Sequence, residues 1–318
     1  MNCKLKLILL LLALMCISGC KVTQKKQVID YMNPEQNITY DKTEVPLIGV
    51  DLNKPTMIDS DEKNLYICDS GNDRIVVWSF ENKLVRTVGM LGSGQAEFIS
   101  PNCIAVNDDC VCVYDSGNYR IQVLTKEGLF VSEISLSESI PRNSKVTDIE
   151  IDTSGTIYLS VMLWGDDLKK SGLYRYAGEK FELIEPITVT KICDCAEENA
   201  ICCVSQYELE NKNAWTTGYA EISTYKDGNC INKNAFSSLF SAVDIVEIDG
   251  AYYVFDDCSR KLYIFNKNGI CEECVFEDEV PSKLIYSGFT GRNDNTLYLT
   301  EITEGKVYML SPVKEKDE

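Results

Sequence analysis

Histidine is absent from all 318 residues, and this absence removes a large part of hydrolytic chemistry. A serine or cysteine nucleophile that depends on a histidine base cannot be built from this chain. A zinc site would likewise have to find four ligands among other side chains. The composition therefore argues against the commonest hydrolytic centres and leaves carboxylate chemistry open.

Basic residues are scarce, with 31 Lys and Arg against 49 Asp and Glu and a net charge of −18. So acidic a surface repels nucleic acid and anionic lipid headgroups. We therefore expect no nucleic-acid partner. The chain is long enough for one large all-β domain with a sizeable core.

The N-terminal apolar run, Leu7 to Met15, is too short to cross a membrane. Lys4 and Lys6 precede it, and Ile17-Ser18-Gly19-Cys20 follows, as in a secretory signal. These last four residues resemble the lipobox of bacterial lipoproteins, which implies cleavage after residue 19 and a lipid on Cys20. Residues 20–37 would then form a tether, and the protein would be extracytoplasmic and anchored to a bacterial membrane by its lipid alone. A buried N-terminal helix or an ordinary cleaved signal are the alternatives.

Two stretches of the chain repeat each other with a shift of 46 residues. Pro55, Asp69-Ser-Gly-Asn72 and Arg74-Ile75 return as Pro101, Asp115-Ser-Gly-Asn118 and Arg120-Ile121. A fixed period of this length is typical of repeat architectures, in which each unit packs against its neighbours.

The same period extends to six units. Short β-branched or aromatic runs recur at Leu65–Ile67, Val111–Val113, Ile157–Leu159, Ile201–Cys203, Tyr252–Val254 and Leu297–Leu299. Each run has one apolar run before it and two after it, which predicts four antiparallel strands per unit. Four-stranded units arranged radially predict an all-β, six-bladed β-propeller over residues 38–312, followed by a charged tail at 313–318. The last unit lacks a fourth strand, so we expect a strand within 38–48 to close the ring.

The glycine-rich stretch Gly89 to Pro101, followed by Asp115-Ser-Gly-Asn118-Tyr-Arg120-Ile121, resembles an NHL repeat. The resemblance covers blades one and two, about 85 residues. Taken whole, the chain is similar to the six-bladed NHL-like propeller lipoproteins of bacteria, most of which have no assigned activity. This resemblance implies a fold and a location.

An acidic residue precedes a basic one by five positions in four of the units. An acid in a hairpin turn accepts backbone N–H groups and pairs with the base, so a pair that recurs is interpreted as structural. The pairs are Asp69 and Arg74, Asp115 and Arg120, Asp256 and Lys261, and Glu301 and Lys306.

Blades three and four lack this pair and have longer connections there instead. Insertions on one face of a repeat protein often bind, and Trp and Tyr are frequent at binding hot spots. The main functional prediction is thus a binding or scaffold module for a protein, peptide or carbohydrate, monomeric and without a required cofactor. The alternatives are aromatic side chains that only hold their own loops down, and adjacent acids that are solvated or bind calcium. The predicted binding residues are Trp164, Asp166, Asp167, Tyr207, Trp215 and Tyr219.

The fifteen cysteines permit disulfides outside the cytosol, and Cys193 could face Cys202 or Cys203 across a hairpin. Cys271-Glu-Glu-Cys274 has the spacing of a metal or redox pair. Because Cys193-x-Cys195 lies on a different blade, the two pairs are not expected to share a zinc ion. Cysteines in strand cores, such as Cys68, Cys103 and Cys112, are interpreted as small apolar residues.

Two enzymes with related propellers, the peptide-amidating lyases and the streptogramin lyases, need histidine and are excluded. The lactonases of the gluconolactonase type remain, since they place a divalent cation such as calcium at the channel mouth on Glu, Asn and Asp. By that resemblance Asn102, Asp148 and Asp244 could converge there, although the first blade has no matching Glu. A hydrated polar channel and a purely structural surface protein are the remaining alternatives.

Overall fold

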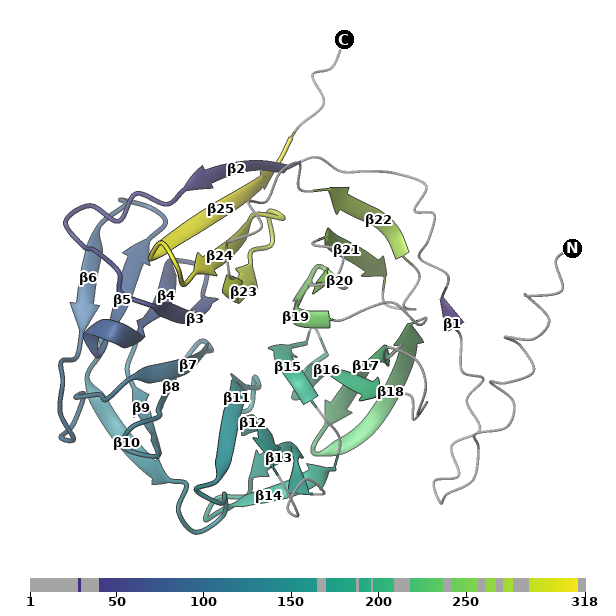
Figure 1. Cartoon of the computed structure of the whole chain (residues 1–318), viewed down its shortest axis with the longest axis horizontal. Coiled ribbons are helices and arrows are strands. Elements are labelled where there is room, and N and C mark those ends of the chain that lie inside the picture. The colour runs from purple at the N-terminus through teal and green to yellow at the C-terminus, as the bar shows by residue number, and fades with distance from the viewer. Residues whose placement is uncertain are drawn as a thin grey trace, which may run out of the picture.

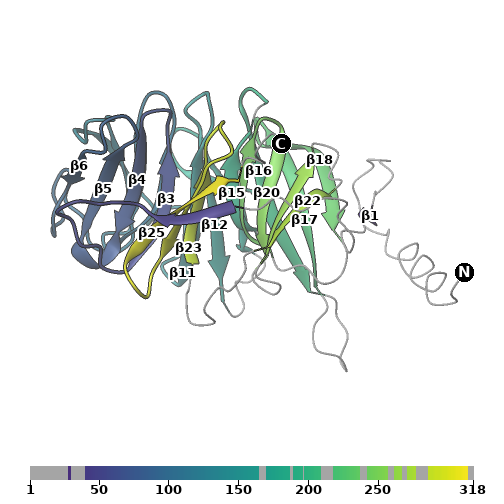
Figure 2. The same ribbon diagram turned by 90° about the horizontal axis from the view of Figure 1, so that it is seen from above.

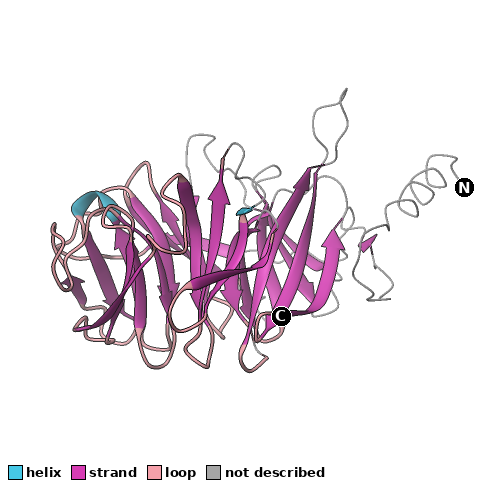
Figure 3. Cartoon of the chain, turned by 90° about the horizontal axis from the view of Figure 1, so that it is seen from below, coloured by secondary structure: helices cyan, strands magenta, loops and turns pink. Residues whose placement is uncertain are grey.

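Six antiparallel sheets surround one axis in the computed structural model, which confirms the six-bladed β-propeller (Figure 1). The structure describes residues 28–29, 40–164, 170–186, 189–195, 197–208, 218–236, 242–256, 261–266, 271–276 and 286–313. Strands and their connecting loops make up almost all of this part, apart from short helical turns such as Ser70–Asn72 (Figure 3).

Apart from two N-terminal strands, the strands of each blade run outward from the axis in chain order. The first three blades contain β3 (Pro55–Ser60), β4 (Asn64–Asp69), β5 (Arg74–Ser79), β6 (Val85–Val88), β7 (Pro101–Val106), β8 (Val111–Asp115), β9 (Arg120–Leu124), β10 (Phe130–Ser135), β11 (Ser144–Ile151), β12 (Ile157–Leu163), β13 (Gly172–Tyr176) and β14 (Phe181–Glu185). The last three contain β15 (Val189–Asp194), β16 (Ala200–Glu208), β17 (Gly218–Lys226), β18 (Asn229–Phe236), β19 (Ala242–Ile248), β20 (Ala251–Asp256), β21 (Lys261–Asn266), β22 (Cys271–Phe276), β23 (Tyr286–Gly291), β24 (Leu297–Glu301) and β25 (Lys306–Pro312).

The N-terminal strand closes the ring, as the sequence predicts. β2 (Tyr40–Glu44) pairs antiparallel with β25 and supplies the outermost strand of blade six (Figures 1 and 2). The Val45 N–H continues the ladder to the Val307 carbonyl at 2.9 Å, and the Lys306 ammonium lies 3.1 Å from the Glu44 carboxylate. Pro46 has no N–H to donate, so the ladder ends there.

Blade four carries one strand more than the repeat predicts. β1 (Val28–Ile29) pairs in parallel with the outer strand β18, with Val28 opposite Ala235 and Ile29 opposite Phe236. These two β-branched residues lie within the expected tether of residues 20–37 and add to a free sheet edge. The expected signal peptide and Cys20 lie outside the described residues. No helix in the described part of the chain has the length and apolar character needed to cross a membrane.

The six predicted β-branched or aromatic runs all fall in the second strand of their blades, and these strands form the centre of the core. The side chains of Leu65, Ile67, Val113 and Leu159 are completely buried, with 0% relative exposure. A second strand is covered on both faces by the neighbouring blades, which explains its nearly continuous apolar sequence.

Each innermost strand has one irregular step in its pairing with the second strand, as between Pro101 and Cys103 or Ala242 and Asp244. Counting from this step aligns the six inner strands. In five blades the residue directly after the step is Cys103, Asp148, Lys191, Asp244 or Gly288. In β3 the step spans two residues, Thr56 and Met57, and Met57 is the one that lies a full repeat of 46 residues before Cys103. We call this set, Met57 included, the central ring.

Candidate functional site

A cavity of ≈ 680 Å³ lies on the axis of the propeller. Its walls are the C-terminal halves of the inner strands and the turns that follow them. The cavity therefore opens on the face where the inner strands end. An apolar belt lines it one residue beyond the central ring, formed by Ile58, Ile104, Ile149, Ile192, Ile245 and Phe289.

The charged lining of this cavity is almost entirely acidic. Among the described residues, Arg292 is the one Lys or Arg side chain that lines it. The acids are Asp59, Asp61, Glu62, Asp108, Asp109, Asp148, Glu150, Asp194, Asp244, Glu247 and Asp294. A concave wall of one charge focuses the field and attracts cations.

Three of these carboxyl groups influence one another electrostatically and are called here the acid triad: Asp59, Glu150 and Asp194. Burial and the charges of Asp59 and Asp194 raise the pKa of Glu150 well above its usual value. Burial and Asp194 raise the pKa of Asp59 to about 8, even though Asp59 is partly open to the cavity. Asp194 is more open to the cavity, and its pKa rises less, to about 6. Desolvation within the cavity and the charge of Glu247 cause this rise.

No ion pair with Lys or Arg reaches the acid triad within the described residues. Asp59 instead accepts the Ser60 N–H and, from the next blade, the Val106 N–H, both at 2.7 Å. The Thr290 hydroxyl lies 3.3 Å from it. These bonds fix the Asp59 side chain between the second and the sixth blade. They provide no positively charged partner for the carboxyl groups of the triad.

Lys191 crosses the axis in the central ring. Its ammonium donates to the Met57 sulfur of the opposite blade at 2.8 Å and lies 3.9 Å from the Asp244 carboxylate. Burial by itself lowers the pKa of Lys191, but Asp244 and Asp148 outweigh it, so the pKa lies above its usual value.

One ammonium cannot neutralise two buried acids. The pKa of Asp244 rises to about 7 because burial and the charge of Asp148 outweigh Lys191. The pKa of Asp148 also rises, chiefly by burial, despite Lys191 and the Ile192 N–H, which Asp148 accepts at 2.8 Å.

The three predicted channel residues do not form one set. Asp148 and Asp244 both belong to the central ring and share Lys191, so an internal cation already lies between them. Asn102 occupies the irregular step of its strand, a position held by Thr147 and Val243 in those two blades. Asn102 is also not among the residues that line the cavity.

Two of the repeated acid–base pairs form short ion pairs. The Arg74 Nε lies 2.8 Å from Asp69, and the Arg120 Nε lies 3.0 Å from Asp115. Each aspartate also accepts the N–H of a residue that precedes its blade, from Asn53 at 2.7 Å and from Ile99 at 2.8 Å.

The other two predicted pairs are cross-strand neighbours. Asp256 lies opposite Lys261, and Glu301 lies opposite Lys306. All four pairs lie at the turn between the second and third strands, on the face opposite the cavity.

The strand ends that the predicted binding loops of blades three and four connect lie on that same opposite face, because these loops too join second and third strands. Trp164 is 54% exposed there. Tyr207 and Tyr219 are directly opposed on β16 and β17. Asp166, Asp167 and Trp215 lie outside the described residues.

The acid triad and Lys191 escaped the sequence analysis because each blade contributes only one or two of them. The strand pairing places Asp148, Lys191 and Asp244 at one level and Asp59 and Glu150 two residues further along, while Asp194 lies three residues beyond Lys191. The predicted contact of Cys193 with Cys202 does occur, since the two residues are cross-strand partners.

No protein-family model and no curated protein matches this chain in sequence. Many solved structures do match it in fold. A gluconolactonase from Xanthomonas campestris is 13% identical with a TM-score of 0.60, over 92% of this chain and 99% of its own. The calcium-binding protein regucalcin from Agrobacterium tumefaciens strain C58 is 11% identical with a TM-score of 0.59, over 88% and 97%. A PQQ-bound aldose sugar dehydrogenase from Streptomyces coelicolor is 12% identical with a TM-score of 0.56, over 88% and 100%. At these identities the similarity shows the propeller fold.

Proposed function

We propose that the protein is a cation-dependent hydrolase of small lactones and that the axial cavity is its active site. The observation that carries this proposal is the acid triad, a group of three carboxyl groups in one cavity with no ion-pairing partner in the described chain. A volume of ≈ 680 Å³ suits a small molecule. The gluconolactonase and regucalcin likenesses support the same choice over a module that only binds.

The triad offers the oxygen ligands that a hard divalent cation such as calcium takes, but its three carboxyl groups do not all lie within 4.8 Å of one another, so binding would require these side chains to move closer together. Calcium takes oxygen ligands, largely carboxylates, and Asp59, Glu150 and Asp194 would supply them. A cation among these three would relieve the repulsion that raises their pKa values. When bound, it would polarise the lactone carbonyl and acidify a water molecule.

The rest of the cavity would select and orient the substrate. The Arg292 guanidinium lies 4.1 Å from the centre of the Phe80 ring, which holds it at the rim, where it would donate to a substrate oxygen. The apolar belt would exclude bulk water from the deep end. A neutral lactone enters an acidic cavity without charge repulsion, whereas its carboxylate product is repelled, so the wall charge favours product release.

The proposal is tested with the full chain by thermal melting in calcium and in chelator, and by proton release from a panel of lactones. Calcium should raise the melting temperature. Glu150→Gln should lower kcat/KM by about 100-fold or more. Asp108→Asn, an exposed acid at the cavity rim, is the control and should stay within about twofold of the parent. A melting temperature that does not change with calcium, together with no hydrolysis of any lactone in the panel, would contradict the proposal.

The lipid anchor and the surface location stand as a second part of the proposal, supported by the order of Lys4, Leu7–Met15 and Cys20. Labelling with a radioactive fatty acid should tag the parent and leave Cys20→Ala unlabelled. Label on Cys20→Ala would refute the anchor.

Binding through the loops of blades three and four stays a separate prediction. The exposed Trp164 supports it, and the strand ends that those loops connect lie on the face opposite the cavity. Both functions therefore fit on one ring. Trp164→Ala should leave lactone hydrolysis unchanged while weakening capture of a partner.

A further inference from the structure

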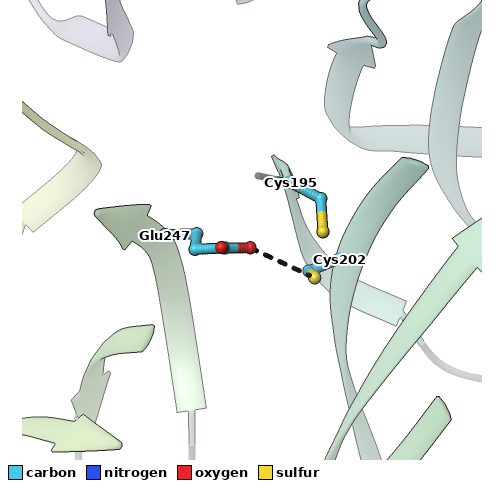
Figure 4. Close-up of side chains that lie close together, drawn as sticks. All are labelled: Cys195, Cys202 and Glu247. Carbon is cyan, nitrogen blue, oxygen red and sulfur yellow. Dashed lines mark hydrogen bonds between the residues drawn. The ribbon is translucent and has the colours of Figure 1, made fainter. Parts of the chain in front are cut away.

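Beside the acid triad lies a group of thiol ligands that the proposed hydrolase does not use. The Cys195 sulfur, the Cys202 sulfur and a Glu247 carboxylate oxygen all lie within 4.8 Å of one another (Figure 4). The Cys202 thiol donates to Glu247 Oε2 at 3.8 Å. We call these three residues the thiol cluster.

Three separate segments of two blades build this cluster. Cys195 directly follows β15, Cys202 lies on β16 and Glu247 lies on β19. Convergence of metal-binding side chains from distant segments is typical of a built site, whereas cysteines that only fill a core point into it singly.

The position of the cluster provides both a rigid base and a route for a metal. Cys202 is fully buried and packs in an apolar cluster with Tyr252 and Val204, and the Tyr252 oxygen lies 3.5 Å from its sulfur. Cys195 and Glu247 line the axial cavity. A metal held by the three would therefore face the cavity on its open side.

The donor set selects a borderline-soft metal. Thiolates favour zinc over calcium and magnesium, which prefer oxygen ligands. Three protein ligands leave one position of a tetrahedral zinc ion for water. Cys193 is the cross-strand partner of Cys202 and also lines the cavity, so a third thiol lies next to Cys202.

We propose that Cys195, Cys202 and Glu247 form a zinc-binding site on the wall of the axial cavity, separate from the calcium site suggested for the acid triad. Zinc would displace the two thiol protons and bind the resulting thiolates together with the carboxylate. This inference does not require the protein to hydrolyse lactones.

The test uses Co²⁺ as a spectroscopic substitute for zinc in the reduced, metal-free full chain. One equivalent of Co²⁺ should produce a sulfur-to-cobalt charge-transfer band and the strong visible bands of four-coordinate cobalt, and Zn²⁺ should remove both. Excess Ca²⁺ should leave the sulfur-to-cobalt band in place, because calcium does not compete for thiolate ligands. The result is thus independent of calcium-dependent melting and lactone hydrolysis.

Cys195→Ser and Cys202→Ser should each weaken Co²⁺ binding by about 100-fold or more and remove most of the charge-transfer band. Cys195 is partly exposed, so Cys195→Ser gives the decisive result if Cys202→Ser fails to fold. Cys230→Ser, a partly exposed cysteine on β18 of the same blade, is the matched control and should bind Co²⁺ like the parent. Absence of a sulfur-to-cobalt band, or an unchanged band in Cys195→Ser, would overturn the proposal. So would a Cys195–Cys202 disulfide that persists in the native protein.

Discussion

The same aspartate–arginine pair occurs in two adjacent blades with different degrees of enclosure. The Arg120 side chain is 11% exposed, and its guanidinium also reaches Glu133 at 2.7 Å and the Gly94 carbonyl at 2.8 Å. The Arg74 side chain is 27% exposed. Removing one partner of a buried pair leaves the other charge without compensation, so the two pairs should differ in their effect on stability.

Arg120→Met should therefore lower the free energy of unfolding by about 3–5 kcal/mol, because Asp115 is fully buried. Asp69 is equally buried, but Arg74 is more exposed than Arg120, so Arg74→Met should cost no more than about 2 kcal/mol. Urea unfolding of both variants against the parent measures the difference. Equal losses would show that enclosure does not govern the strength of this motif.

These pairs were visible in the sequence because both members lie in one hairpin and recur with the period of the fold. Lys191 was not visible, because its partner Met57 is 134 residues away and Asp244 belongs to another blade. A contact across the axis leaves no local spacing to recognise.

At the level of single elements, β2 has the largest influence on the ring. It contributes five backbone pairings to β25, and Val45, directly after it, is 4% exposed and packs between blades six and one. Without this strand, β25 would be a free edge at the junction of the first and last blades.

Val45→Asp should lower the melting temperature markedly, because it buries an unpaired carboxylate in this junction. Thr43→Asp, on an exposed position of the same strand, is the control and should change stability by less than about 0.5 kcal/mol. Thermal melting measures the stability of both variants. A Val45→Asp protein as stable as the Thr43→Asp protein would show that β2 does not hold the ring closed.

The sequence predicted the second strands well, because burial on both faces requires continuous apolar runs such as Tyr252–Val254. It also predicted the closing strand, because the last unit lacks a fourth strand and residues 38–48 precede the first unit without a partner strand. It missed β1, since two residues, Val28 and Ile29, give no periodicity, and their pairing depends on a free edge formed two hundred residues later.

Across the whole molecule, acidic charge is concentrated where the six blades meet. The sequence has a formal net charge of −18, and several of the axial acids have raised pKa values in the folded protein. The pKa of Asp244 is about 7 and that of Asp59 about 8, against a usual 3.8. Between about pH 4 and pH 8 the folded protein thus keeps protons that the unfolded chain has released.

Unfolding releases these protons, so stability should fall as the pH rises from 5 to 8. Asp244→Asn should flatten part of this dependence, whereas the exposed Asp108→Asn should leave it unchanged. Urea unfolding at a series of pH values measures both slopes. A parent protein that gains stability over this range would contradict the protonation of the axial acids.

The axial site could be predicted less well than the ring that surrounds it. The repeat fixes where the blades are, because apolar packing is the same in every unit. Function uses the positions where the units differ, such as Asp59, Glu150 and Lys191, and these become neighbours only when six distant inner strands are brought to one axis.

The pairing of β2 with β25 also determines when the propeller can exist. β2 is among the first strands to be synthesised and β25 is the last, so blade six stays incomplete until synthesis of the propeller is finished. Once β25 is made, its free edge can pair with the β2 of its own chain or with the β2 of a second chain. At high concentration of newly made protein, strand exchange into a domain-swapped dimer is thus the misassembly that this closure invites.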